Sequence, residues 1–257
     1  MKRAILIVSG ILFVVPVVAM VWFSLKVVGK PGALTLQHYV DVFTPANEAT
    51  YDVLFTGLFN SLGICLITVA IVLLLLLPTM ILVELKFPKL RSLLEFICII
   101  PVTIPSIVLV VGFVPVYSVV AQIFGSSTWT LAFAIGVIVL PYAFRPIAAN
   151  LASIEVTVLS EASRSLGASW PSVLTGVLLP NLRRGILSSC FITIAVVLGE
   201  FTIASFLSRN TFQTALILLQ QTDPYVAVIF AVFALVFAFV LLLLIGRLGA
   251  NRTRRPA

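Results

Sequence analysis

The sequence predicts an all-α integral membrane protein with six transmembrane helices. Of its 257 residues, 61% are hydrophobic and only 10% are charged, and the mean hydropathy is +1.22. A soluble domain carries about 25% charged residues and cannot bury so much apolar surface. The apolar residues gather in six runs, each long enough to cross a bilayer as a helix. None of the runs alternates apolar and polar residues in the manner of a barrel strand.

The six expected spans follow one another along a single domain of residues 1–257. They lie at about 4–25, 58–83, 93–121, 129–149, 186–207 and 225–246. The first run has a cleavable signal peptide as its alternative interpretation. Its apolar stretch exceeds the usual length of roughly 7–15 residues and lacks an A-x-A cleavage site. We therefore expect the first span to be retained.

The basic residues predict how the spans are oriented. With the amino terminus inside, only Lys26, Lys30 and Arg209 fall in outside segments, and the other 13 of the 16 Lys and Arg residues fall in inside segments. Cytoplasmic segments of membrane proteins carry such an excess of Lys and Arg. Both termini are therefore expected in the cytoplasm.

The residues that build covalent or metal chemistry are scarce. Cys65, Cys98 and Cys190 lie far apart in apolar runs, and His38 is the one histidine. The sequence therefore predicts neither a catalytic site nor a metal site. The one Gly-Lys pair precedes Pro31, so a phosphate-binding G-x-x-x-x-G-K-[ST] loop is excluded. If ATP hydrolysis drives the activity of this protein, another chain has to bind the nucleotide.

The longest inside connection, residues 150–185, joins the fourth and fifth spans. In it Ile154, Val158, Ala162 and Leu166 recur at four-residue spacing, which predicts an amphipathic helix. One interpretation of such a helix is an element that rests on lipid head groups.

The second half of this connection is predicted to turn back as another helix. Gly167 stands where a left-handed helix cap is expected. Ser169 is then a favourable N-cap, and Pro171 is tolerated in the first helical turn. We expect this second, short helix to end near Pro180.

The residues of this connection resemble the signature loop of permease subunits in binding-protein-dependent ABC importers, E-A-A-x3-G-x9-I-x-L-P. Every spacing is preserved, and the two departures are Ser163 for the second Ala and Val177 for Ile. The family places the loop between its fourth and fifth spans, as here. Three other segments also resemble the family, namely Asn60-Ser61, the stretch from Pro101 to Pro105, and the run from Leu140 to Arg145.

The resemblance implies the type I ABC importer permease fold, with a cytoplasmic coupling helix between spans 4 and 5, and no enzymatic activity in this chain. The residues implied in coupling to an ATPase are Glu161, Ala162, Ser163, Gly167 and Pro180. ATP and Mg would be bound by the partner ATPase, and no cofactor is expected in this chain.

The resemblance also implies a set of partners. They are a second permease subunit (expected to be a different chain), two ATPase subunits and an extracytoplasmic solute-binding protein. Membrane lipid surrounds such a chain, and no nucleic acid is expected. The implied location is the bacterial inner membrane.

The fifth run contains an acidic residue, Glu200, next to Gly199 and Thr202. A charge near the bilayer centre costs roughly 2.5–3.5 kcal/mol, so such residues usually face the interior of a helix bundle. Glu200 and Thr202 are therefore candidates for lining a translocation path. A bond from Glu200 to a partner subunit, or a protonated carboxyl that only packs, is the alternative.

The transported solute is expected to be small. The Gly-Glu-Phe-Thr motif of residues 199–202 resembles the polyamine branch of the family, which suggests a small cation such as a polyamine. Importers of ferric iron, thiamine or phosphonate are alternatives within the same class. An ion-driven secondary carrier is an alternative of a different class, but such carriers tend to show several intramembrane ionisable groups and inverted repeats.

Overall fold

The computed structural model describes residues 2–27, 32–44 and 48–250. The described chain is almost entirely helical, with an isolated β-bridge between Lys26 and Leu34. Six of its helical segments are long and apolar enough to cross a membrane: Ile7–Ser24, Tyr51–Lys86, Ser106–Phe124, Thr128–Ala152, Trp170–Gly199 and Pro224–Leu244. These segments confirm the predicted fold class. Of the residues that predicted the orientation, Lys30, Arg252, Arg254 and Arg255 lie outside the described residues.

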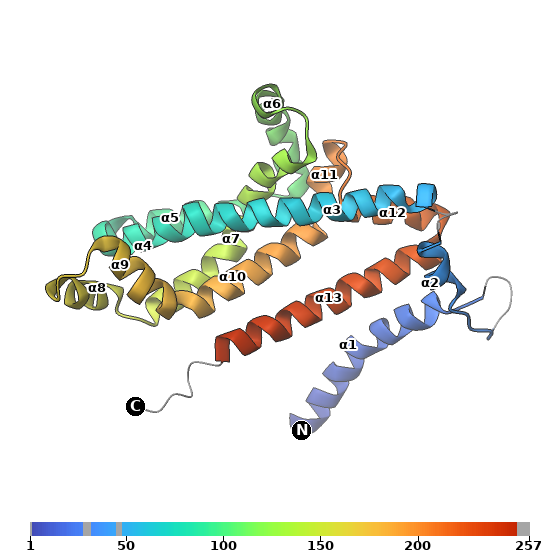
Figure 1. Cartoon of the computed structure of the whole chain (residues 1–257), viewed down its shortest axis with the longest axis horizontal. Helices are drawn as coiled ribbons and strands as arrows, with labels where there is room; N and C mark the ends of the chain where they lie inside the picture. Colours follow the sequence, from blue (N-terminus) through green and yellow to red (C-terminus); the bar gives the residue numbers. More distant parts are fainter. Residues whose placement is uncertain (1, 28–31, 45–47, 251–257) are drawn as a thin grey trace. The chain divides into compact units, whose positions relative to one another are not determined.

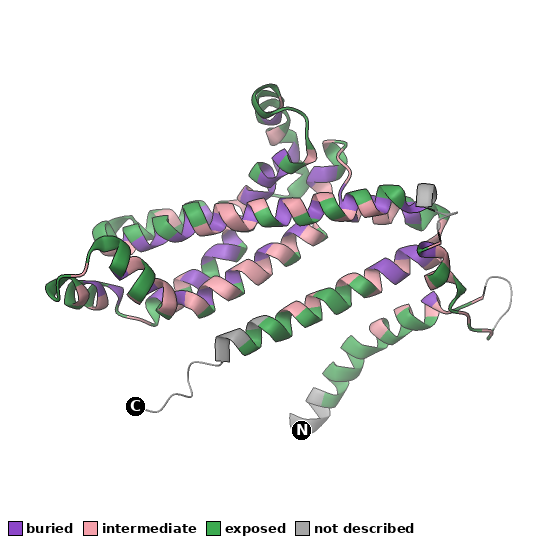
Figure 2. Ribbon diagram, viewed as in Figure 1, coloured by how far each residue is buried: buried purple, intermediate pink, exposed green. Residues whose placement is uncertain are grey.

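The chain divides into two compact units, residues 1–59 with 210–240 and residues 60–209 with 241–257. The first unit contains α1 (Lys2–Ser24), α2 (Gln37–Val42), the start of α3 (Glu48–Ile71), α12 (Phe212–Thr222) and most of α13 (Pro224–Ala250). Figure 2 shows that α1 is exposed along almost all of its described length. An apolar helix with so little cover is typical of one that faces lipid.

The core of the first unit joins the start of α3 to α12 and α13. Tyr51 and Leu54 of α3 are buried against Phe212 of α12 and Phe230 of α13. The hydroxyl of Tyr51 donates a hydrogen bond of 3.1 Å to Asp223, just before α13. A buried aromatic core with one polar anchor thus fixes these three helices to one another.

The second unit contains the remaining helices. They are the rest of α3, the π turn η2 (Val72–Leu76), α4 (Leu77–Lys86), the 3-10 turn η3 (Pro88–Leu90), α5 (Arg91–Thr103), α6 (Ser106–Phe124), the 3-10 turn η4 (Thr128–Thr130), α7 (Leu131–Ala152), α8 (Val156–Ser165), α9 (Trp170–Val173), the π turn η5 (Leu174–Leu178), α10 (Leu179–Gly199) and α11 (Thr202–Phe206). Figure 1 shows α7 and α10 side by side, and these two helices share the most extensive contact in the unit. Ile135, Ile147 and Leu182 are fully buried in its core.

The predicted run 93–121 forms two helices rather than one. α5 ends at Thr103, α6 begins at Ser106, and Ile104 between them is extended, with φ −100° and ψ 126°. A proline ring disfavours the helical conformation of the residue before it, and Pro105 imposes this on Ile104. Figure 1 shows α6 leaving the direction of α5. The single span predicted here is therefore divided into two helices.

The second span stays helical across Pro78 because its backbone bonds shift by one residue. Leu77 donates its N–H to the carbonyl of Val72, five residues earlier, which creates the π turn η2. Thr79 then donates a side-chain hydrogen bond of 2.6 Å to the carbonyl of Leu75. Proline lacks an N–H and clashes with the carbonyl four residues before it. The π turn and the additional side-chain hydrogen bond accommodate Pro78 within a continuous helix.

Candidate functional site

The helix α8 leaves an apolar strip uncovered. Its buried positions are Val156 and Ser160, which are 2% and 3% exposed. Of the residues at the predicted four-residue spacing, Ile154 precedes the helix and packs against the core. Val158 is 55% exposed, and Leu166, directly after the helix, is 90% exposed. Ala162 between them is also exposed. The amphipathic helix is therefore confirmed, but its apolar stripe faces away from the chain, where a covering partner can reach it.

Glu161 and Ser163 differ in their surroundings on this helix. Glu161 is exposed, and no hydrogen bond or ion pair engages its side chain within the described part of the chain. Ser163 is half-buried, and its hydroxyl donates a hydrogen bond of 2.7 Å to the carbonyl of Leu159. The charge of Glu161 is therefore available to a partner, whereas the hydroxyl of Ser163 already has an acceptor inside the helix.

Gly167 ends α8 in the conformation that the sequence predicted. Its φ is +85°, in the left-handed region. Its N–H donates to the carbonyl of Arg164 at 2.9 Å, and the N–H of Ala168 donates to the carbonyl of Ser163 at 3.1 Å. These two bonds form a Schellman cap, which satisfies carbonyls at the end of a helix. The cap reverses the chain directly after the exposed Leu166.

The second helix of the connection begins as predicted but does not end near Pro180, so that prediction was wrong. Ser169 occupies the N-cap position, although its side chain makes no capping bond. Leu179 donates its N–H to the carbonyl of Leu174, five residues earlier, and Asn181 donates a side-chain hydrogen bond of 2.8 Å to Val177. This is the arrangement seen around Pro78, and it carries the helix past Pro180 into α10 without a stop.

The fourth and fifth spans cross closely at the base of this connection. The side-chain oxygen of Asn150 in α7 accepts a hydrogen bond of 2.8 Å from the backbone N–H of Gly185 in α10. A Cβ at position 185 would lie 2.8 Å from the carbonyl oxygen of Pro146 and 2.7 Å from the Cβ of Asn150. Only glycine allows so close a crossing, so the two spans are held together where the connection starts and ends. The sequence pattern did not predict the contact between Asn150 and Gly185.

Glu200 lies at a break in the fifth predicted run. α10 ends at Gly199, and the short α11 begins at Thr202. The two carboxylate oxygens of Glu200 accept backbone hydrogen bonds from Ile203 at 2.8 Å and Ala204 at 3.2 Å. The half-buried Glu200 therefore caps α11, and Thr202 stands in its first turn. The hydrogen bonds that the structure shows for this carboxylate are made within the chain itself, and a role of Glu200 in a translocation path stays a prediction.

A second cluster fixes α11 against α6 and α7. The guanidinium of Arg209 lies over the ring of Tyr117 at 5.7 Å and donates a hydrogen bond to the carbonyl of Ser126. The hydroxyl of Tyr117 is hydrogen-bonded to that of Thr130 at the start of α7. Sequence inspection did not single out Tyr117 or Thr130, because neither stands out from the apolar runs around it.

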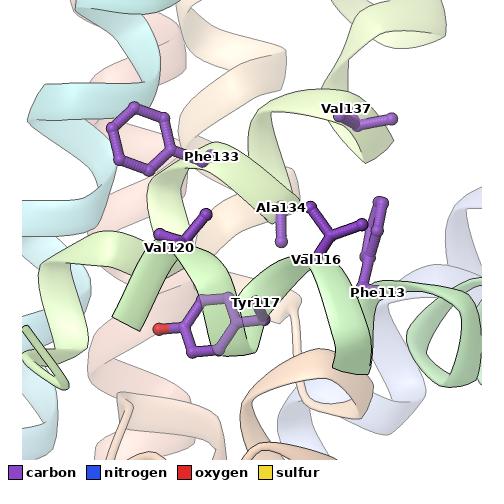
Figure 3. A pocket seen from close by; sticks show the side chains of 7 residues that line it. All are labelled: Phe113, Val116, Tyr117, Val120, Phe133, Ala134 and Val137. Carbon is purple, nitrogen blue, oxygen red and sulfur yellow. The ribbon is translucent and has the colours of Figure 1, made fainter. Parts of the chain in front are cut away.

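α6 and α7 also line a small, half-open cavity of about 110 Å³. Figure 3 shows its lining residues, which are Phe113, Val116, Tyr117, Val120, Phe133, Ala134 and Val137. The hydroxyl of Tyr117 is the one polar side-chain group among these residues, and it is already bonded to Thr130. A polar solute would lose its hydration here without gaining partners, so this cavity does not suit one.

Comparison with known proteins gives two matches. Residues 81–254 match the family described as "Binding-protein-dependent transport system inner membrane component". Over 115 residues the chain is 30% identical to the "Phosphate transport system permease protein PstA" of Pasteurella multocida (strain Pm70). That match covers 45% of this chain and 40% of the relative, so the chain aligns with less than half of the relative's length.

Proposed function

Since the chain belongs to the family of binding-protein-dependent transport system inner membrane components, we propose that it forms half of the translocation path of an ATP-driven importer and that α8 is its coupling helix. A permease subunit of this family is a multi-pass membrane protein and not an enzyme. The uncovered face of α8 is the observation that carries the proposal, because it offers a partner an apolar strip with an unpaired carboxylate beside it.

Each residue of the signature loop has a proposed role in this contact. Leu166 and Ala162 would pack in a cleft of the ATPase, where the small Ala162 permits a close approach. Glu161 would pair with a basic group of the ATPase. Ser163 would contribute by being small, because its hydroxyl already donates a hydrogen bond to a carbonyl within the helix. Gly167 sets the turn, and Pro180 sets the π turn that joins the loop to α10.

The movement would enter the membrane through α7 and α10. Closure of two ATPase subunits on ATP and Mg would displace α8, and the crossing of Asn150 with Gly185 would pass this displacement to both spans together. Rigid-body rocking of packed helices is an established type of allosteric transition. A second permease subunit would supply the other half of the path, and an extracytoplasmic binding protein would deliver the solute. Both termini of this chain would lie in the cytoplasm of a bacterial cell.

Photo-crosslinking tests the contact between α8 and an ATPase. A photoreactive phenylalanine analogue at position 166 is expected to form an adduct with the ATPase in cell membranes, since Leu166 is 90% exposed at the centre of the proposed contact. The same analogue at position 220, an exposed residue of α12 on the predicted outside, is expected to give no such adduct. Adducts with the ATPase from position 220 and none from position 166 would contradict both the contact and the orientation.

The break at Glu200 is the proposed place where solute passes. Non-helical backbone at membrane depth is tolerated where it is buried in protein or lines a water-filled cavity, and for the segment around Glu200 and Thr202 we propose the second case. The motif of residues 199–202 suggested a small cation such as a polyamine, but the carboxylate oxygens of Glu200 accept hydrogen bonds from N–H groups of α11. The relative's name concerns phosphate. We infer that Glu200 shapes the path and does not select the solute, so phosphate stands beside a polyamine as a candidate.

The substitution Glu200→Gln separates these two roles of the carboxylate. An amide offers one acceptor oxygen instead of two, so the cap weakens by about 1 kcal/mol, and we expect a lower melting temperature and slower uptake. The preference between phosphate and spermidine is expected to stay unchanged, as measured by stimulation of ATP hydrolysis in the reconstituted importer. Glu95→Gln, at an exposed position of α5, is the matched control. Selective loss of stimulation by spermidine would instead assign the carboxylate to a cationic solute.

A further inference from the structure

The short helix α2 is held at the ends of α1 and α13 within the first unit. The hydroxyl of Tyr39 shares a hydrogen bond of 2.7 Å with that of Ser24, the last residue of α1. The ring of His38 is stacked on the ring of Tyr225, the second residue of α13, with 4.7 Å between their centroids. Tyr39 also lies edge-on to the ring of Phe233 in α13. Figure 1 shows α2 beside the ends of these two helices, and the side-chain contacts fix it there.

These helix ends lie at a membrane surface. The candidate span of α1 ends at Ser24, and that of α13 begins at Pro224. The next charged residue after Ser24 is Lys26, and the residue before Pro224 is Asp223. Charges are costly in the hydrocarbon core, so the first charges beyond two apolar spans mark the level where the core ends. The exposed Trp22 near the end of α1 fits this level, because Trp is enriched at membrane–water interfaces.

The surface of α2 and its flanking residues divides into three faces. Each helical residue advances by about 100°, so residues three, four and seven positions apart lie on one face. The three faces are formed in turn by His38 with Tyr39 and Val42, by Gln37 with Asp41 and Thr44, and by Leu36 with Val40 and Phe43. The first face is packed on the chain, and the second is polar. The third is apolar, and its three side chains are between 56% and 68% exposed.

Three faces of this kind suit a helix that lies along a membrane surface beside transmembrane helices. Such a helix meets protein on one side, water on a second and lipid on a third. The packed and polar faces of α2 fit the first two environments, which leaves lipid for the exposed apolar face. Amphipathic interfacial helices bury such a face at the boundary between head groups and acyl chains. A stable protein interface takes about 20–30 residues a side, far more than this apolar face offers.

We propose that α2 is an interfacial helix whose residues Leu36, Val40 and Phe43 rest in the lipid at the membrane surface. Through Tyr39 and His38 it would hold the ends of α1 and α13 at this level. This anchor would matter most for α1, which is exposed along almost all of its described length. The proposal depends on the membrane topology of α1 and α13 and not on the docking of an ATPase.

Photo-crosslinking to lipid tests the proposed contact in the assembled importer. A photoreactive phenylalanine analogue at position 40 of the full-length chain, irradiated in cell membranes, is expected to form adducts with phospholipid acyl chains. Mass spectrometry of the purified chain detects them. Position 37, which is also exposed but lies on the polar face of α2, is the matched control and is expected to give several-fold fewer lipid adducts.

Equal yields of lipid adducts at positions 40 and 37 would overturn the proposal. Adducts of position 40 with a binding protein or a second permease subunit, in place of lipid, would also overturn it and assign the apolar face to a protein contact. Position 14, where Val14 is exposed within the span of α1, reports the lipid contact of the span itself. Adducts at position 14 without adducts at position 40 would leave the membrane topology intact and overturn the interfacial role of α2.

A second measurement tests whether the contact is apolar. The chain with the analogue at position 40 is reconstituted in vesicles of phosphatidylcholine alone or of phosphatidylcholine with phosphatidylglycerol. The same yield of lipid adducts is expected in both, because burial of an apolar face does not require an anionic head group. Adducts that form only with phosphatidylglycerol would overturn the apolar contact and indicate attraction between the head groups and Lys26.

Discussion

Within the connection of residues 150–185, Gly167 is the position where the backbone conformation most restricts the choice of side chain. Its φ of +85° lies in the left-handed region, where a residue with a Cβ is strained. The two bonds of the Schellman cap depend on that conformation. The direction in which Leu166 is presented therefore depends on a glycine at position 167.

We predict that Gly167→Ala lowers stability by about 1–2 kcal/mol, the cost of the left-handed conformation for a residue with a Cβ. Because the strain can relax by reorienting the loop, coupling of ATP hydrolysis to uptake is expected to fall as well. Thermal unfolding and the ratio of solute transported to ATP hydrolysed measure the two effects.

Gly176→Ala is the control for this substitution. Gly176 is helical, and a Cβ there would meet no atom within 4 Å. Alanine is expected to stabilise that position by about 0.5–1 kcal/mol. A destabilisation at position 176 equal to that at position 167 would show that the loop tolerates no change at all, and the conformational explanation would fail.

For single residues, the sequence predicted the backbone conformation more accurately than the exposure of the side chains. The cap at Gly167 follows from a glycine placed after a helical pattern, which is a local property. The exposure of Val158 and Leu166 could not be predicted, because a periodic pattern reveals two faces of a helix without telling which one the chain covers. The capping bonds of Glu200 were missed for a related reason: an acidic residue in an apolar run indicates a polar neighbour without identifying it.

At the scale of elements, α7 and α10 act as one body because of their crossing at Asn150 and Gly185. The crossing lies just before the connection leaves α7 and just after it enters α10. A displacement of α8 would therefore reach both spans, because the two helices are too close at this contact for either backbone to shift independently.

The substitution Gly185→Ala is predicted to open this crossing. A Cβ would stand 2.8 Å from a backbone carbonyl oxygen, which has no freedom to move aside as a side chain does. Overpacking of this kind costs typically about 1–3 kcal/mol, and we expect thermal unfolding to shift accordingly. The hydrogen bond to Asn150 would lengthen, and coupling would weaken more than solute binding.

Gly136→Ala in α7 provides the matched comparison, because its Cβ would meet its nearest neighbour, a methyl group of Ile71, at 3.9 Å. A small effect on stability and coupling is expected there. If Gly185→Ala were as well tolerated as Gly136→Ala, the close crossing would be excluded.

The lengths of the apolar runs predicted the number of spans but not their continuity. Pro105 breaks the third run, whereas Pro78 and Pro180 lie within helices that continue across them. The difference comes from the neighbours. Leu77 and Leu179 can shift their bonds by one residue, and Thr79 and Asn181 supply side-chain donors. Such compensation depends on several hydrogen bonds that form together in the folded chain. The presence of a proline in the sequence does not predict whether they form.

At the scale of the whole molecule, the six spans and the placement of their charges agree. Two candidate spans separate Lys86 from Trp170, so both residues lie on one side of the membrane, as their contact requires. The contact between these two residues, far apart in the sequence, agrees with an even number of spans between them.

The central claim is that force enters the membrane part of an importer through α8. ATP-driven uptake of phosphate and of spermidine into proteoliposomes tests it most directly, with the chain reconstituted beside its partner permease, ATPase and binding protein. The variant Glu161→Lys is compared with Glu155→Lys, the same charge reversal at another exposed residue of the loop. We predict that Glu161→Lys inserts and unfolds like the wild type but transports nothing above background, whereas Glu155→Lys transports normally. Normal ATP-driven uptake by Glu161→Lys would contradict the account.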